Sequence, residues 1–380
     1  MCSPLYLDHA ATAPPLPEAI AAFAESSSLE FANPGSLHEP GAQAGRSLRR
    51  SREALIQAFG ADNYSLIFTG TGTEADHLGV QGLARTLQRP NKGQKILFGA
   101  AEHPAVRESA LALRGEGFQV EAIPVDSAGL IQPKCLQPLL NDEVVLVAIQ
   151  WANNELGGLN PIADLVQLVK QHAPRAAFHV DAVQAAGKRP ETFDELGADS
   201  FAVASHKIGG VRGCAALFLR EGSPKPTPFF LGGGHESGLR SGTENVAGAK
   251  SFAVAAEYRS QLIQAEPGAY FTRRKWLLDS IQKARPGILP LGPSQDSDIQ
   301  GSILTLAFPG ERAEPLLHQL EAKGILCGSG SACSTHGSEE SPVLEAIGLD
   351  PGFRNSVLRF SVNGTESEES LHRVAQALSS

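Results

Sequence analysis

The run FHVDAVQ at residues 178–184 predicts a short buried strand that ends at Asp181. A second run of the same kind, Ser200–Ala204, is followed within three residues by Lys207. Because the carboxyl ends of parallel strands meet at one edge of a sheet, we expect Asp181 and Lys207 to face the same cleft. The two strand ends therefore predict both a parallel sheet and the place of a functional site at its edge.

A lysine and a carboxylate in one cleft have a specific use. The lysine can hold an aldehyde cofactor as a Schiff base, while the carboxylate keeps a pyridine nitrogen protonated. Each residue alone also has an ordinary interpretation, because most lysines are solvated and a strand-end aspartate such as Asp181 often caps a helix. The combination at two strand ends favours the cofactor site.

A glycine-rich turn follows another predicted strand, in the sequence FTGTGTE at residues 68–74. Glycines allow close backbone approach, and the helix that follows offers free N–H groups to a phosphate. Thr73 could instead be a simple helix cap. A third interpretation is the dinucleotide fingerprint G-x-G-x-x-A at residues 70–75, with Glu102 as a ribose contact. That fingerprint normally opens a domain, and nothing nearby resembles a hydride-transfer site.

Strands and helices alternate from about residue 45 to residue 255, which predicts an α/β fold with a mostly parallel seven-stranded sheet covered on both faces. The predicted strands are Ser65–Thr69, Lys95–Gly99, Gln119–Pro124, Val144–Ile149, Ala177–Val180, Ser200–Ala204 and Ala215–Leu219. The predicted helices between and before them are Gln43–Phe59, Glu74–Leu87, Ala105–Gly115, Pro161–His172 and Asp194–Leu196.

The rest of the chain predicts a smaller α+β domain. It contains a long helix over Glu257–Ala284, a strand over Ile303–Phe308, a helix over Ala313–Lys323, a strand over Val357–Ser361 and a closing helix over Glu366–Leu378. We expect a large domain over residues 15–255 and a small domain built from residues 1–14 and 256–380. The Gly- and Pro-rich stretch Glu221–Gly234 predicts an excursion over the surface or toward a partner subunit.

Composition excludes several classes of function. Thirty-two basic and 41 acidic residues give a net charge of −9, without a basic block that would suit nucleic acid. No Lys or Arg precedes Arg46, and the apolar runs are too short to span a bilayer, so we expect neither export nor a membrane role. Five cysteines without metal-binding spacing indicate reduced thiols in a cytoplasmic protein with no metal site.

With these sites in place, the chain resembles the pyridoxal-phosphate enzymes of fold type I. Within that group it is similar to the class V aminotransferases that act as cysteine desulfurases. The motifs that carry the resemblance occur in the family's order along nearly the whole chain: YLDHAAT 6–12, NPGS 33–36, TGTEAD 71–76, EHPAV 102–106, NNELG 153–157, HVDAVQ 179–184, SHK 205–207, GGGHE 232–236, RSGT 240–243, GSGSACS 328–334 and LRFS 358–361.

The resemblance implies a role for each matching residue. Lys207 would be the Schiff-base lysine, Asp181 would pair with the pyridine nitrogen, and His103 would stack on the ring and transfer protons. The remaining contacts to the cofactor would come from Gly72, Thr73, Asn154, Gln184, Ser205 and His206, with Thr243 reaching in from the partner subunit of a homodimer. Arg359 would bind the substrate carboxylate, and Asn33 would approach it.

Cys333 is the candidate nucleophile, because a loop of small residues, 329–334, should leave its thiol exposed. It could also be a free cysteine tolerated in a loop. Cys327 follows two apolar residues and predicts a strand-end or buried thiol. As the family resemblance implies, L-cysteine would give L-alanine and a persulfide on Cys333, which passes sulfur to an acceptor for iron–sulfur assembly, tRNA thiolation, nucleic-acid sulfur modification or another use.

The chain departs from the family's sequence pattern just before His206, and two alternative functions remain open. The family usually has serine followed by a small residue before His-Lys, whereas this chain has Ala204 and then Ser205, so a serine contact to the phosphate is lost or shifted. A selenocysteine lyase or another aminotransferase-type enzyme, in which Cys333 is dispensable, is the first alternative. A catalytically inactive scaffold is the second.

Overall fold

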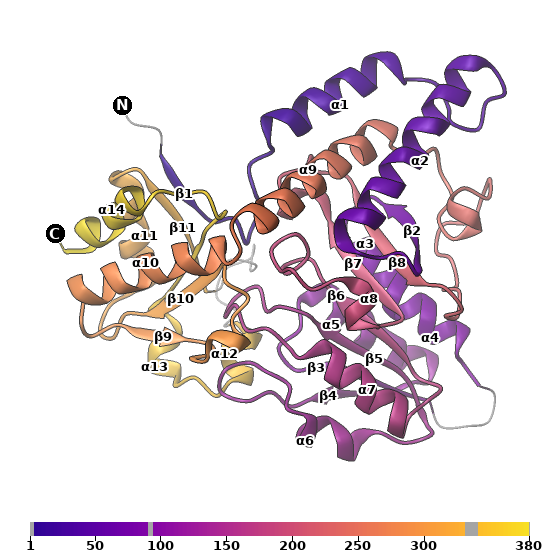
Figure 1. Ribbon diagram of the computed structural model, residues 1–380. Helices are drawn as coiled ribbons and strands as arrows, with labels where there is room; N and C mark the ends of the chain where they lie inside the picture. The colour runs from indigo at the N-terminus through magenta and orange to yellow at the C-terminus, as the bar shows by residue number, and fades with distance from the viewer. Residues whose placement is uncertain (1–3, 90–93, 331–340, 380) are drawn as a thin grey trace.

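The computed structural model describes residues 4–89, 94–330 and 341–379, which form two β-sheets with their covering helices. Figure 1 shows the larger sheet and its helices as one layered body, with the smaller sheet to one side. β1 and α14, which lie near the two ends of the chain, both belong to the smaller part.

The larger sheet has seven strands in the order β2-β8-β7-β6-β5-β3-β4. All neighbours pair in parallel except β8, which is antiparallel to both β2 and β7. This confirms the predicted mostly parallel seven-stranded sheet, and each predicted strand lies within one residue of its observed bounds at either end. The strands are β2 Tyr64–Thr69, β3 Lys95–Gly99, β4 Gln119–Ile123, β5 Val144–Gln150, β6 Ala177–Asp181, β7 Ser200–Ala204 and β8 Ala215–Arg220.

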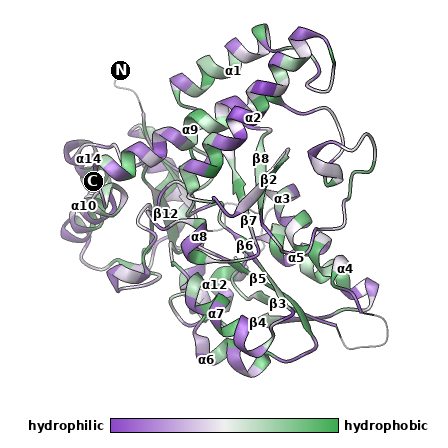
Figure 2. Cartoon of the chain, turned by 45° about the vertical axis from the view of Figure 1, so that its right-hand side comes forward, coloured by the Kyte–Doolittle hydropathy of each residue, from purple (hydrophilic) through white to green (hydrophobic). Residues whose placement is uncertain are grey.

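Helices cover both faces of this sheet, as a parallel sheet requires. Every residue of β5 is buried, which explains its unbroken apolar sequence. One face packs against α1 Pro17–Leu29, α2 Glu39–Phe59, α7 Ile162–His172, α8 Phe193–Leu196 and α9 Val246–Ala265. The other packs against α3 Gly72–His77, the π-helical turn Leu78–Gly82, α4 Leu83–Thr86 and α5 Pro104–Ala112. Figure 2 shows that these helices carry both hydrophobic and hydrophilic residues.

The smaller sheet has five strands in the order β1-β11-β12-β10-β9, with β1 parallel to β11. Its apolar core is separate from those of the larger sheet and includes residues of α10, α11 and α14. The strands are β1 Leu5–Leu7, β9 Leu289–Leu291, β10 Ile303–Ala307, β11 Ile325–Ser329 and β12 Val357–Ser361. The helices are α10 Ala269–Ala284, α11 Ala313–Ala322, α12 Pro342–Ala346, α13 Pro351–Arg354 and α14 Glu368–Ser379; a short α6, Pro133–Leu136, lies beside the larger sheet.

The single long helix predicted over 257–284 is wrong. The chain instead forms α9, which ends at Ala265, and α10, which begins at Ala269. Pro267 cannot continue the hydrogen-bond ladder, and Gly268 has φ 82°, a left-handed conformation that favours glycine. Because α9 begins at Val246, the expected domain boundary at 255/256 falls inside a continuous helix. Within the described part of the chain, no helix is both long and apolar enough to cross a bilayer.

Candidate active site

A cavity of about 430 Å³ lies at the carboxyl edge of the larger sheet. The turns that follow β2, β3, β5, β6 and β7 contribute to it, because β2 runs in the same direction as β7 and all these strand ends meet at one edge. The residues that line it are Ala10, Ala11, Thr71, Gly72, Thr73, Asp76, His103, Gln150, Ala152, Asn154, Asp181, Val183, Gln184, Ala204, His206, Lys207 and Arg359.

Lys207 closes a short 3₁₀ turn that directly follows β7. Its Nζ donates to the backbone oxygens of Ala10 and Ala11, at 2.6 and 2.9 Å. These carbonyls belong to the N-terminal segment that enters from the smaller sheet. The ammonium group is therefore held at the cavity wall, an arrangement that favours a site role over the interpretation of Lys207 as an ordinary solvated lysine.

Asp181 is the last residue of β6 and is 7% exposed. Its Oδ1 accepts a hydrogen bond of 2.9 Å from the backbone N–H of Val183, so the side chain does stabilise the local turn. Burial raises the pKa of Asp181, and the nearby His103 and Lys207 act in the opposite direction. A cation bound in the cavity would therefore stabilise the carboxylate.

His103 caps the N-terminus of α5. Its Nδ1 accepts from the backbone N–H of Ala105 at 3.1 Å, and a backbone N–H can only donate. The neutral ring must therefore carry its proton on Nε2. Burial, together with the charge of Lys207, lowers the pKa of His103, while Asp181 raises it. Neutral His103 has a proton to donate at Nε2.

The glycine-rich turn lines the cavity at the start of α3. Thr71, rather than Thr73, is the cap of this helix, since its hydroxyl accepts from the N–H of Glu74 at 3.1 Å. A Cβ added to Gly72 would lie 3.3 Å from Val183 and 3.4 Å from Ala204. The turn therefore leaves Thr73 free of capping and keeps its backbone close to the β7 side of the cavity.

His206 and Ser205 precede Lys207 but differ in position. The His206 Nδ1 lies 3.0 Å from the hydroxyl of Thr12, and burial lowers the pKa of His206 to about 4, so the ring is neutral at pH 7. Ser205 is fully buried, its Oγ has no hydrogen-bond partner among the described residues, and it packs against Gly210. Ala204 lines the cavity instead of Ser205. The exchanged order of these two residues thus moves the hydroxyl away from the cavity.

Arg359 reaches the cavity from β12 of the smaller sheet and is 2% exposed. One terminal nitrogen donates to the backbone oxygen of Asn154 at 3.0 Å, and the other donates to Asp8 at 2.9 Å. The Nε of Arg359 is buried without a partner among the described residues. A planar guanidinium at the cavity wall is suited to binding a carboxylate.

Three predicted residues that the structure describes do not line this cavity: Asn33, Thr243 and Ser205. Asn33 and Thr243 are exposed. Asn33 accepts from the N–H of Gly35 at 2.8 Å, which forms a local turn. Cys333 lies outside the described residues. The other predicted residues, from both parts of the molecule, line one cavity.

Two described cysteines are poorly suited to nucleophilic chemistry. Cys327 lies on β11, where burial raises its thiol pKa to about 12, and burial raises that of Cys214 to about 12 as well. A thiol with so high a pKa carries almost no thiolate at neutral pH. The sequence predicts a strand-end or buried thiol at Cys327; the residue lies in the middle of β11 and is half-buried.

Sequence reasoning missed several contributors. The motif at residues 6–12 was recognised, but no role was assigned to Asp8 or to the carbonyls of Ala10 and Ala11. Backbone carbonyls leave no side-chain signal in a sequence. Lys188, which follows the strand-end motif by one helical turn, was missed as well, although its spacing from Gln184 could have suggested a contact.

Comparison with known proteins gives a consistent result. The family model "Aminotransferase class-V" matches residues 5–374. "Cysteine desulfurase IscS" of Dictyoglomus turgidum is 32% identical over 374 residues, which cover 98% of this chain and 93% of the relative. A solved "NifS-like protein" superposes with a TM-score of 0.90 at 28% identity, covering 99% of this chain and 98% of that one. The structure "SspA in complex with cysteine" has a TM-score of 0.81 at 25% identity, covering 96% of this chain and all of that one.

Proposed function

The chain belongs to the class-V aminotransferase family, and on that premise we propose that it is a cysteine desulfurase dependent on pyridoxal 5'-phosphate. The reaction converts L-cysteine to L-alanine and transfers the sulfur to a cysteine of the enzyme. The observation that carries this proposal is the meeting of Lys207, Asp181 and His103 in one cavity, with Arg359 at its far side.

The residues of the cavity fit this cofactor. An amine, a buried carboxylate, a neutral histidine and two side-chain amides, those of Asn154 and Gln184, surround a space of about 430 Å³. Gly72 leaves a narrow place where a Cβ would be tight against both Val183 and Ala204, next to the first turn of α3. Backbone N–H groups in such a turn suit a phosphate. When bound, pyridoxal phosphate supplies an aldehyde for a lysine amine and a ring that accepts electrons.

Each side chain then has a defined task. The Lys207 amine holds the cofactor and, when released, takes the Cα proton of the substrate. The carbonyls of Ala10 and Ala11 orient that amine. The Asp181 carboxylate stabilises a protonated ring nitrogen, and His103 carries a proton at Nε2 for the leaving group. Arg359 binds the carboxylate of L-cysteine, which positions the substrate Cα near Lys207.

Cys333 accepts the sulfur. Its thiolate attacks the sulfur atom of L-cysteine, so that an S–S bond forms as the C–S bond breaks, and the amino acid leaves as L-alanine once protons return to its carbons. The net change is L-cysteine plus a thiol giving L-alanine plus a persulfide, which needs no external oxidant or reductant.

The ends of the segment that contains Cys333 support this assignment. Gly330, on one side, donates to the backbone oxygen of Val357, two residues from Arg359. Ser341, on the other side, hydrogen-bonds Glu155, which follows Asn154. Both ends are thus attached beside residues that line the cavity.

The finer assignments follow from the same proposal. The enzyme acts as a homodimer, in which the exposed Thr243 completes the phosphate site of the partner subunit, and Asn33 belongs to the approach to the substrate. A cytoplasmic location suits a reaction that needs a reduced thiol. The persulfide passes its sulfur to an acceptor protein.

The test compares Cys333→Ser with the matched control Cys327→Ser. Each purified protein is loaded with pyridoxal phosphate and exposed to L-cysteine, after which alanine is quantified and intact mass and peptide mass spectra locate any added 32 Da, the mass of one sulfur atom. We expect wild type and Cys327→Ser to form alanine and to carry sulfur on Cys333, and Cys333→Ser to do neither.

Other outcomes would redirect the proposal. Unchanged sulfur release by Cys333→Ser would refute the nucleophile. Preference for selenocysteine, with release of selenide, would indicate a selenocysteine lyase, and formation of a keto acid would indicate an aminotransferase. A protein that takes up no pyridoxal phosphate would be the inactive scaffold.

A further inference from the structure

Lys188 is a buried cation behind the cavity that the proposed mechanism does not use. Its side chain is 6% exposed, although lysines are almost never buried without a partner of opposite charge. Its Nζ makes one hydrogen bond, of 3.3 Å, to the side-chain oxygen of Gln184, and it forms no ion pair within the described part of the chain. Burial, reinforced by the cations Lys207, Arg259 and Arg359, lowers the pKa of Lys188 to about 7.

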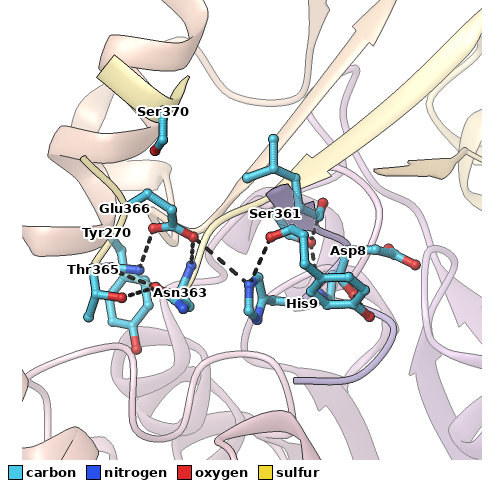
Figure 3. Close-up of polar contacts among 12 residues, drawn as sticks. Asp8, His9, Tyr270, Ser361, Asn363, Thr365, Glu366 and Ser370 are labelled. Atoms are coloured by element: carbon cyan, nitrogen blue, oxygen red, sulfur yellow. Dashed lines mark hydrogen bonds and ion pairs between the residues drawn. The ribbon is translucent and has the colours of Figure 1, made fainter. Parts of the chain in front are cut away.

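The carboxylate beside His9 is engaged elsewhere. Burial and the charge of Lys188 both lower the pKa of His9, whose ring lies 3.9 Å from Glu366, and Glu366 accepts from the backbone N–H groups of Asn363 and Gly364. Figure 3 shows His9 and Glu366 turned toward one another, with Asn363 beside the carboxylate. Asp8 is paired with Arg359. Among the described residues no carboxylate pairs with Lys188, so its burial beside the Gln184 amide needs an explanation other than ion pairing.

Two contacts determine the orientation of the Gln184 amide. The backbone oxygen of Ala10 can only accept, so the Gln184 atom that faces it, at 2.9 Å, is the NH₂ nitrogen. The side-chain oxygen then points the other way, where it accepts from the Nζ of Lys188 at 3.3 Å. The Ala10 oxygen also accepts from Lys207. One N–H of Gln184 therefore donates to Ala10. The second N–H belongs to a side chain that also lines the cavity.

We propose that Lys188 is a positioning residue that fixes the Gln184 amide with its second N–H toward the cavity, where it donates to an anionic oxygen of the cofactor ring. This inference rests on the proposed function, because it needs the cofactor in the cavity. Without Lys188, only the Ala10 carbonyl holds the amide in this orientation, and a rotated amide presents its oxygen to that anion, an unfavourable contact between two acceptors. Below about pH 7, where Lys188 is protonated, its positive charge also adds to the stabilisation of the anion through the polarised amide.

The experiment uses holoenzyme with pyridoxal phosphate bound, in wild type, Lys188→Met, Gln184→Ala and the double variant. The absorbance of the cofactor bound to Lys207 is titrated from pH 6 to pH 10, and the cofactor dissociation constant is measured by equilibrium dialysis. Loss of a hydrogen bond to the ring oxygen should raise the pKa of this titration by about half a unit to one unit. We expect that shift in both single variants and no larger shift in the double variant.

Arg259→Met is the matched control. Arg259 is also a buried cation near Lys188, but it donates to the backbone of Ile208 and Asn363 and to Tyr270, not to Gln184. It should leave the titration of the bound cofactor unchanged, whatever its effect on thermal unfolding. Lys188→Leu provides a second apolar replacement should Lys188→Met not fold.

Three results would overturn the inference: an unshifted titration in Lys188→Met, a shift of equal size in Arg259→Met, or fully additive shifts in the double variant, which would mean that Lys188 acts independently of Gln184. Failure of the proposed function has a different signature, because wild type itself would then bind no cofactor or release no sulfur from L-cysteine.

Discussion

The carboxyl edge of the larger sheet and the exposed segments around Asn33 and Thr243 carry predicted site residues in very different states. At the sheet edge, Asp181 and Lys207 line one cavity, and hydrogen bonds within the chain hold their side chains in place. Asn33 and Thr243 are exposed and do not line that cavity. The sheet edge is organised by one chain, whereas the proposed role of Thr243 requires a second subunit.

The difference has a physical cause. A strand end is fixed by the ladder hydrogen bonds of its neighbours and by the packing of both faces of the sheet, so its polar side chains are positioned at little further entropic cost. Thr243 follows Gly242, which has φ 117°, in a segment without strand or helix. Such a segment has no ladder hydrogen bonds of a strand or helix to fix the position of its side chains.

The largest effect should come from the sheet edge. Asp181→Asn removes the negative charge that stabilises a protonated ring nitrogen, and we expect kcat for alanine formation to fall by roughly 10²–10³-fold. Asp164→Asn, an exposed aspartate on α7, is the control and should leave kcat unchanged. Steady-state assays of alanine formation measure kcat for both variants. A wild-type kcat in Asp181→Asn would show that this carboxylate has no part in the reaction.

Burial at the sheet edge should also be visible in the pH dependence of stability. Burial raises the pKa of Glu155, which follows β5, from 4.5 to about 7. The folded state therefore binds this proton more tightly, and the contribution to the free energy of unfolding is greatest below about pH 4.5 and is lost as the pH rises through about 7. Glu155→Gln removes the titration, and its stability relative to wild type should increase by on the order of 3 kcal/mol between pH 4.5 and pH 8.

Thermal or urea unfolding across that pH range measures the difference, with exposed Glu314→Gln as the control. Parallel pH profiles of wild type and Glu155→Gln would show that the Glu155 carboxyl is not held protonated by its surroundings.

An intermediate effect is expected from Thr243, the exposed residue that we propose completes the site of the partner subunit. Thr243→Ala should lower kcat/KM by about tenfold, the equivalent of one hydrogen bond to a charged group. Mixing Thr243→Ala with Lys207→Ala subunits should restore activity, because a mixed dimer has one site with an intact Lys207 and an intact Thr243 from the other subunit.

The two variants are mixed and refolded together, or incubated until they exchange subunits. The activity of the mixture is then compared with that of each variant alone. Absence of complementation would mean that Thr243 does not act across the interface, and the contrast between the two regions would then lose its explanation.

The smallest effect concerns Ala204. A serine there would place a hydroxyl on the cavity wall near Gly72, and Ala204→Ser should tighten cofactor binding by about fivefold through one added hydrogen bond to the phosphate. Ser205→Ala is the control, since the Ser205 hydroxyl is buried outside the cavity lining and should not affect the dissociation constant of the cofactor. Equal effects of both changes, measured by dialysis, would place the phosphate elsewhere.

The large sheet was predictable because its signals are local. The run VVLVAI at 144–149 is apolar throughout, which identifies a strand buried on both faces, and the polar residues Gln150 and Asp181 mark the carboxyl ends of β5 and β6. The break between α9 and α10 was missed although Pro267 and Gly268 signal it, because the helical pattern on both sides was treated as continuous. The short strand β1 carries too few residues to show a pattern at all.

The sequence by itself determined the α/β sheet, the residues at its strand ends and the chemistry that they can perform, because these depend on residue type and on spacings of a few positions. Only the tertiary structure decided which groups hold them. Lys207 is oriented by a carbonyl 197 residues away, and Arg359 pairs with an aspartate 351 residues away. It also decided that Ser205 leaves the cavity and that Lys188 faces Gln184. Such contacts arise when distant segments pack together, and packing is set by the whole fold rather than by any local pattern.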